Sequence, residues 1–206
     1  MDKDYEEQHI LKFYGYFYDP NDICFYLCME AFENAKLLEK DMKKYDEYES
    51  LVITRQITRA VSFLAKEEIW LKNFSFDYIF VNSQLEIKIW DLGLIDGIVR
   101  IWNGFLNKLP MYAAPEMFTS SEEYYNKNES WSIGVILYRL LYKELPFKTK
   151  PIKMKKKKFI KEITNLGGRI SEFGLSEIEK THEIKDCWSN VFKHTLTNRE
   201  DRMSSE

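Results

Sequence analysis

Apolar runs separated by turn residues mark two hairpins in the first half of the chain. Residues 10–19 and 23–29 are rich in aromatic and aliphatic side chains, and residues 20–22, Pro-Asn-Asp, have turn chemistry. A second pair of runs covers residues 78–81 and 85–90, with the polar residues Asn-Ser-Gln between them. Two small antiparallel sheets are therefore predicted.

Helical spacing replaces these short runs elsewhere. Residues 49–66 carry one apolar stripe, and residues 129–145 are apolar almost all round, which is typical of a helix buried in the centre of a domain. Pro146 and Pro151 are expected to end the second helix. Residues 32–47 mix charges with two leucines and predict a short polar helix. Sheets first and helices afterwards indicate an α+β fold.

Composition and charge exclude several classes of protein. The 206 residues are 45% hydrophobic and 16% aromatic, which indicates one folded domain with its own core. A net charge of -3 gives no general attraction to nucleic acid or anionic lipid. The polar start is no signal peptide, no apolar run approaches the roughly 18 residues of a membrane span, and Cys24, Cys28 and Cys187 form no paired pattern. We expect a cytoplasmic or nuclear protein with neither a nucleic-acid nor a membrane partner.

Five motifs follow one another in a fixed order. They are Asp91-Leu92-Gly93, Ala114-Pro115-Glu116, Trp131-Ser132-Ile133-Gly134-Val135, Leu145-Pro146-Phe147 and Asn198-Arg199-Glu200-Asp201-Arg202. In this order they resemble the signatures of eukaryotic protein kinases: D-F-G, A-P-E, the W-S-x-G-V of the central helix, and the late arginine. The resemblance covers essentially the whole chain. It implies a protein-kinase-like fold, with a mostly helical large lobe and a partial small-lobe β-sheet.

The resemblance also implies how the single domain, residues 1–206, is divided. Residues 1–30 correspond to part of the small lobe and the start of the hinge, and residues 31–206 to the large lobe. The chain contains no G-x-G-x-x-G loop and no V-A-I-K lysine. We therefore expect it to begin partway through the small lobe, through an incomplete gene model or a true truncation. An exposed strand edge would result, through which two copies could dimerise.

The nucleotide site of the family maps onto a few residues. Met29, Glu30 and Phe32 resemble the hinge, with Met29 in the gatekeeper position, and Phe80 is expected to form the floor of the adenine pocket. Asp91, in the D-F-G position, is the one metal-binding carboxylate kept. It is interpreted either as a weak Mg²⁺ ligand or as a hydrogen-bonded turn residue inherited from the fold.

The catalytic loop is located by its distance from the strand at 79–81. The metal-binding Asn of the family comes just before this strand, a position held here by Tyr78. The base Asp precedes that Asn by five residues in H-R-D-L-x-x-x-N, which assigns Asn73 to its place, and Ser75 replaces the following lysine. An amide is a very weak proton acceptor, and a bulky phenol is a poor Mg²⁺ ligand.

Scaffold positions of the family are kept. Glu116 and Arg202 are expected to form the buried ion pair that holds the activation segment, and Glu129 stands where an Asp caps the catalytic-loop backbone. Residues 94–113, the expected activation loop, contain no Ser or Thr, and their one hydroxyl is Tyr112. Three positions of the family's apolar spine are matched by Phe13, Leu71 and Leu92.

The parts that fold the large lobe are thus kept, and the parts that transfer phosphate are mostly lost. The sequence predicts a pseudokinase acting as a protein-interaction or regulatory module with unknown protein partners. The alternatives are an ATP-dependent protein Ser/Thr kinase whose gene model lacks the N-terminal nucleotide-binding strands, and a non-functional fragment. No cofactor is assigned, with weak ATP and Mg²⁺ binding left open. A lysine-rich run at 148–161 is either a solvated loop or a basic patch for nuclear import or an acidic partner.

Overall fold

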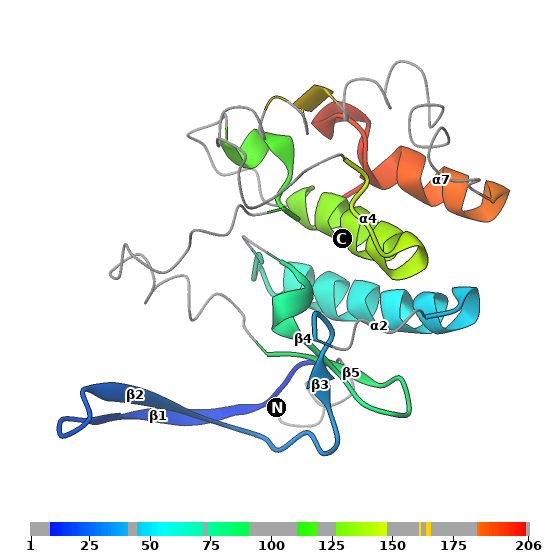
Figure 1. Cartoon of the computed structure of the whole chain (residues 1–206). Helices are drawn as coiled ribbons and strands as arrows, with labels where there is room; N and C mark the ends of the chain where they lie inside the picture. Colours follow the sequence, from blue (N-terminus) through cyan, green and yellow to red (C-terminus); the bar gives the residue numbers. More distant parts are fainter. Residues whose placement is uncertain are drawn as a thin grey trace.

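Two small sheets and three longer helices form the part of the chain that the computed structural model describes (Figure 1). The described residues are 9–40, 45–71, 74–90, 111–118, 127–147, 161, 164–165 and 185–204. The strands are β1 (Phe13–Asp19), β2 (Cys24–Met29), β3 (Lys36–Leu37), β4 (Ile79–Val81) and β5 (Ile87–Ile89). The helices are α2 (Glu47–Lys66), α4 (Asn128–Tyr142) and α7 (Asp186–Thr195), with single 3-10 turns at Phe76–Tyr78, Pro115–Phe118 and Arg199–Asp201.

The first predicted hairpin is confirmed. Strands β1 and β2 pair antiparallel, with Phe17 opposite Tyr26 and Asp19 opposite Cys24. At the turn, the Asp19 carboxylate accepts a hydrogen bond from the backbone N–H of Asn21 at 2.8 Å. The hairpin extends away from the rest of the molecule, at the lower left of Figure 1, as a two-stranded sheet of its own.

The second predicted hairpin, β4 and β5, is confirmed as well and gains a third strand. Ile79 lies opposite Ile89 and Val81 opposite Ile87, and these four side chains are buried beneath α2. The added strand is β3, which pairs antiparallel with β4.

The polar helix predicted for residues 32–47 is wrong within the described residues. Strand β3 lies in this stretch, and the backbone N–H of Leu38 continues its pairing by bonding the Ile79 carbonyl at 2.8 Å. Asn34 has a left-handed φ of 55°, which interrupts any helix there. The free edge of β4 therefore overrides a weak local helical preference.

Helix α2 begins two residues before the predicted start, because its N-terminus is capped. Asp46 accepts a hydrogen bond from the backbone N–H of Glu49 at 2.7 Å, and the Glu49 carboxylate accepts one from the backbone N–H of Asp46 at 3.1 Å. This reciprocal capping box satisfies backbone donors that the first turn leaves unpaired. The apolar stripe of α2 faces the sheet and α4, with Ile53 and Ile57 fully buried.

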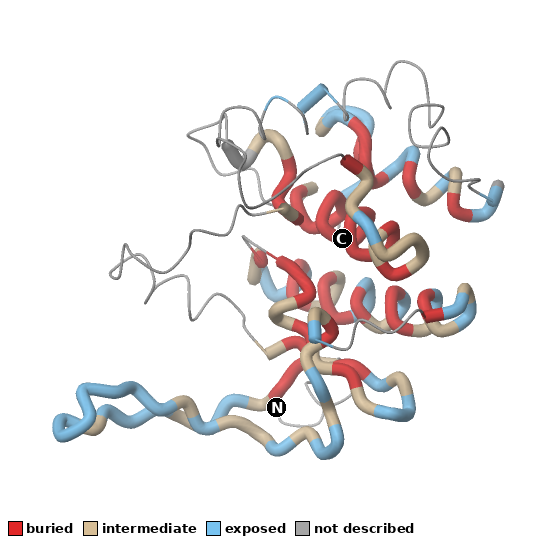
Figure 2. The backbone as a smooth tube through the Cα atoms, viewed as in Figure 1, coloured by how far each residue is buried: buried red, intermediate tan, exposed pale blue. Residues whose placement is uncertain are grey.

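Helix α4 is buried on nearly all sides, as predicted, and Figure 2 shows it in the buried colour. A Cβ at Gly134 would come within 2.8 Å of Thr195 Cβ and 2.9 Å of Leu196 Cδ2, so glycine lets α7 approach closely. The helix ends at Tyr142, earlier than Pro146 predicts, because Lys143 takes a left-handed conformation with φ of 61°.

Candidate functional site

The outer face of the β3–β4–β5 sheet, opposite α2, carries a cluster of aromatic rings. Phe80 lies across the ladder from Lys88, and Tyr78 and Trp90 flank this pair. The ring of Trp90 has its centroid 6.0 Å from that of Tyr78 and 6.3 Å from that of Phe80. The indole Nε1 donates to the Asp77 carbonyl at 2.9 Å, which fixes the ring in place. All of these side chains are half-buried.

An ion pair joins this face to the segment that follows β2. Lys88 Nζ donates to one carboxylate oxygen of Glu30, and the other oxygen accepts a hydrogen bond from the backbone N–H of Lys12 at 2.8 Å. Lys88 Nζ also lies 5.7 Å from the centre of the Phe32 ring. The structure therefore brings Glu30 and Phe32 to the sheet face that carries Phe80.

The segments on both sides of Asn73 are held by side-chain hydrogen bonds. Glu129, only 1% exposed, accepts a hydrogen bond from the backbone N–H of Leu71 at 2.7 Å. Ser75 caps the 3-10 turn that leads into β4, since its hydroxyl accepts from the backbone N–H of Asp77 at 3.3 Å. Asn73 itself lies outside the described residues.

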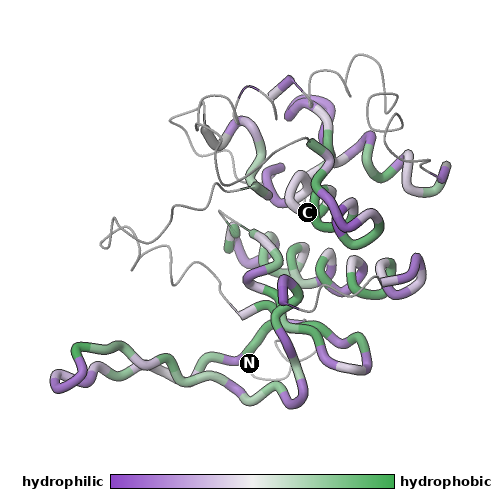
Figure 3. Tube along the Cα trace, viewed as in Figure 1, coloured by the Kyte–Doolittle hydropathy of each residue, from purple (hydrophilic) through white to green (hydrophobic). Residues whose placement is uncertain are grey.

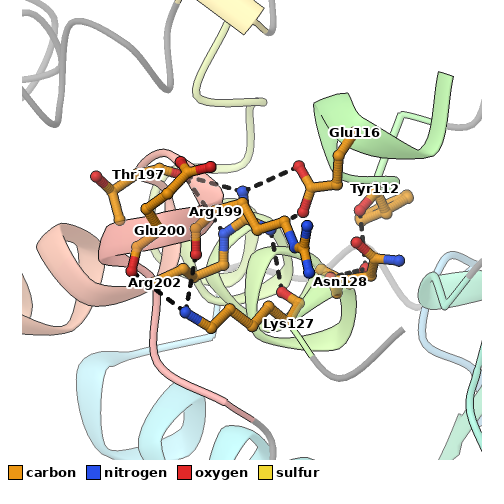
Figure 4. Close-up of polar contacts among 9 residues, drawn as sticks. Tyr112, Glu116, Lys127, Asn128, Thr197, Arg199, Glu200 and Arg202 are labelled. Carbon is orange, nitrogen blue, oxygen red and sulfur yellow. Dashed lines mark hydrogen bonds and ion pairs between the residues drawn. The ribbon is translucent and has the colours of Figure 1, made fainter. Parts of the chain in front are cut away.

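Arg202 and Glu116 form an ion pair at the centre of a dense set of polar contacts (Figure 4). Arg202 donates from Nη1 and Nη2 to the two Glu116 oxygens, from Nη2 to the Thr197 carbonyl at 2.9 Å, and from Nη1 to the Lys127 carbonyl at 3.1 Å. Its guanidinium lies 5.0 Å from the centre of the Trp131 ring. Burial lowers the pKa of Arg202, and the Glu116 carboxylate opposes this shift.

Arg139 organises a second, half-buried cluster of polar contacts, which the sequence interpretation missed. It donates from Nη1 and Nη2 to the two oxygens of Glu39, at 2.7 and 2.9 Å, and from Nη1 to the Tyr112 hydroxyl. The guanidinium also lies 5.1 Å from the centre of the Phe76 ring. This cluster ties α4 to the residues before Ala-Pro-Glu and to those after β3. The sequence did offer one signal for this cluster, because Arg139 is a charged residue inside the otherwise apolar helix α4.

Tyr112 makes the stability of the fold sensitive to alkaline pH. Burial raises the pKa of its hydroxyl above the ordinary value of 10.0, and the neighbouring Arg139 guanidinium only partly offsets this. The unfolded chain ionises this tyrosine near pH 10, whereas the folded chain keeps it neutral. Its contribution to stability is therefore complete below about pH 10 and is lost as the pH rises from there toward the folded pKa.

Urea titrations at several pH values test this effect. Above about pH 10, Tyr112 is expected to add up to roughly 1.4 kcal/mol per pH unit to the loss of unfolding free energy. The variant Tyr112→Phe should lack this part of the slope, whereas Tyr48→Phe, at a position that is 71% exposed, should keep it. Equal slopes for wild type and Tyr112→Phe would contradict the assignment.

Comparison with known families decides the identity of this fold. The model for the protein kinase domain matches residues 1–205. The chain belongs to the protein kinase family. The fold class is accordingly α+β, with a partial small-lobe sheet and a mostly helical large lobe.

Several curated protein kinases are similar to the chain. Serine/threonine-protein kinase polo of Drosophila melanogaster is 32% identical over 151 residues, which cover 70% of this chain and 25% of that protein. Hormonally up-regulated neu tumor-associated kinase homolog B of Xenopus laevis is 29% identical over 184 residues, 85% of this chain and 29% of that protein. Hormonally up-regulated neu tumor-associated kinase of Homo sapiens is 28% identical over 184 residues, which cover 85% of this chain and 26% of that protein. The chain thus spans about a quarter of the relatives' length.

Other kinase positions expected from the sequence are placed as follows. Met29 ends β2 and lies opposite Phe13. Phe13 is 41% exposed, so its predicted place in a buried apolar spine is wrong in this structure, whereas Leu71 is 5% exposed and belongs to the core. Asp91 and Leu92 lie outside the described residues, as does most of the lysine-rich run. Among the described helices, none is both long and apolar enough to cross a bilayer.

Proposed function

We propose that this protein kinase domain is a pseudokinase that acts as a protein-interaction or regulatory module. Asn73 carries the proposal, because the register counted back from β4 assigns an amide to the position of the proton-accepting carboxylate. An amide does not take a proton from a hydroxyl at neutral pH. Loss of a general base alone lowers a rate by roughly 10²–10⁴-fold.

The surroundings of Tyr78 support the same proposal. A Mg²⁺ ion bound with nucleotide needs compact oxygen ligands in near-octahedral geometry. Tyr78 instead offers a neutral phenol whose ring packs against Trp90. This position does not fit a metal ligand, and of the family's metal-binding residues Asp91 is the one kept in the sequence.

An ATP-dependent protein Ser/Thr kinase is the second candidate function. The names of the curated relatives favour it, since polo of Drosophila melanogaster is a serine/threonine-protein kinase. The hydrogen bond from the Leu71 backbone N–H to Glu129 and the Glu116–Arg202 ion pair serve an active and an inactive domain equally well. The two candidates therefore differ in the catalytic loop rather than in the scaffold.

Nucleotide binding and phosphate transfer separate these candidates. We expect no shift in melting temperature with ATP, with or without Mg²⁺, whereas a ligand at a hundredfold excess over its dissociation constant would add about 2.7 kcal/mol. In a transfer assay with radiolabelled ATP and a generic protein substrate, wild type and Asp91→Ala should give the same background signal. Turnover that survives purification and disappears in Asp91→Ala would overturn the proposal and support the kinase.

A further inference from the structure

The outer face of the β4–β5 hairpin is the face on which a nucleotide base is expected to lie. Figure 3 shows mainly hydrophobic residues along both strands, which read Ile-Phe-Val and Ile-Lys-Ile. Side chains alternate between the two faces of a sheet, so the isoleucines and Val81 point toward α2, and Phe80 and Lys88 point away from it. The resemblance assigns Phe80 to the floor of an adenine pocket, which places the expected base position on this outer face.

Trp90 already lies on this face and is fixed there by its backbone, its indole N–H and its ring contacts. Its backbone N–H donates to the Tyr78 carbonyl at 3.0 Å, which continues the β4–β5 ladder by one step. Its indole Nε1 donates to the Asp77 carbonyl at 2.9 Å. Its ring meets those of Tyr78 and Phe80 at interplanar angles of 53° and 49°. A half-buried ring with a satisfied donor and two aromatic neighbours has little freedom to move aside.

An indole is chemically close to a purine base. Both are planar, fused two-ring aromatic systems that stack on other rings and donate N–H groups to carbonyl oxygens. The chain supplies both kinds of contact to Trp90, through the rings of Tyr78 and Phe80 and through the carbonyl of Asp77. We propose that the Trp90 indole is a built-in occupant of the base position, so that the chain itself fills the place that a purine would take on this face.

The charges beside Phe80 indicate what would bind once the indole is removed. Lys88 lies opposite Phe80 and is paired with Glu30, so its charge is largely neutralised and offers little attraction to a triphosphate. The vacancy should therefore accept an uncharged purine, independently of Mg²⁺. The inference rests on the proposed function, because it gives a structural reason for the absence of nucleotide binding.

Replacing Trp90 with alanine tests whether the vacancy accepts a purine. Free adenine and free indole should each raise the melting temperature of Trp90→Ala, by roughly 2–4 °C at about 5 mM ligand for a dissociation constant of about 1 mM. Neither ligand should change the melting temperature of the wild type. No rise with adenine, even where indole alone gives one, would overturn the proposal, and so would an equal rise in the wild type.

Trp188→Ala is the matched control. The Nε1 of Trp188 donates to Glu47 at 2.9 Å, the same distance as the indole hydrogen bond of Trp90. Trp188 lies on α7, on the far side of α4 from the sheet (Figure 1), so its replacement leaves a vacancy away from the proposed base position. Adenine should not stabilise this variant. An equal rise in both alanine variants would mean non-specific binding to a weakened fold and would overturn the assignment.

The wild-type chain gives a second test that does not depend on the folding of the alanine variant. The indole N–H signal of Trp90 in a proton–nitrogen NMR spectrum, assigned by its loss in Trp90→Phe, should be protected from exchange. Adenine, adenosine and ATP with Mg²⁺ should leave it unmoved, and a saturable shift with any of them would overturn the built-in occupancy. Phosphate transfer by the wild type would instead contradict the proposed function, so the two failures are told apart.

Discussion

Replacing Arg202 with methionine is expected to lower the free energy of unfolding by about 3–5 kcal/mol. Methionine keeps most of the side-chain volume but supplies no donor. Glu116 would lose both of its hydrogen bonds from Arg202, and the carbonyls of Thr197 and Lys127 would lose theirs. The cost is high because removing one member of a buried ion pair leaves the other charge uncompensated.

The exposed ion pair between Lys185 and Glu47 provides the matched comparison. Its side chains are 67% and 40% exposed, so water screens the pair, and Lys185→Met is expected to cost much less than Arg202→Met. Urea denaturation of both variants, followed by circular dichroism, measures the two effects. Similar costs for the variants would show that Arg202 contributes little beyond a surface ion pair.

Replacing Trp131 with alanine is expected to cost about 3–5 kcal/mol as well. Trp131 is 0% exposed on the most buried helix and is among the largest fully buried side chains of the described residues. Alanine would leave a large cavity there, whereas Trp131→Phe, which retains a ring, should cost less. Leu51→Ala, at a position of α2 that is 49% exposed, is the control and should cost under about 1 kcal/mol.

Combining the two largest substitutions tests how they are linked. The Arg202 guanidinium lies over the Trp131 ring, so the double variant should lose less than the sum of the single losses. Denaturant unfolding of the four proteins in this cycle gives the coupling energy. Strict additivity would show that the contact between ring and guanidinium contributes no stability.

The hydrophobic pattern of the sequence was sufficient to predict the helices and hairpins that bury one face or all of their faces. The stripe of α2 and the apolar run of α4 each satisfy one simple periodicity, and both helices were predicted within a few residues of their observed bounds. The two hairpins were marked by turn residues between apolar runs. Local sequence dictates such elements because each buries its side chains at a fixed spacing.

Features that depend on contacts between distant segments could not be read from the pattern. Strand β3 has two residues and exists because β4 offers an unpaired edge, so no local signal distinguishes it from a loop or helix. The helix α4 was predicted to extend to 145, but a left-handed Lys143 ends it first. Arg139 and Glu39 are 100 residues apart in the chain, and only the fold brings them together.

The candidate site was predicted mainly through resemblance to a family. Motif order located Glu116, Arg202 and Glu129, and the structure gives the ion pair and the backbone hydrogen bond in which they take part. The Glu30–Lys88 ion pair was missed, since no motif signals it. The predicted roles of Asn73, as an amide in place of the catalytic base, and of Asp91, as a weak metal ligand or a turn residue, stay predictions that the transfer assay tests.

The hydrogen bonds of the Gln56 side chain should determine which elements of the large lobe unfold together. Its amide nitrogen donates to the Leu85 carbonyl at 2.7 Å, and its amide oxygen accepts from the backbone N–H of Ile87 at 3.1 Å. One side chain of α2 thus copies the hydrogen bonding of a neighbouring strand. The amide of Ile87 should therefore exchange with deuterium only when α2 and the β4–β5 hairpin open together, as one cooperative unit.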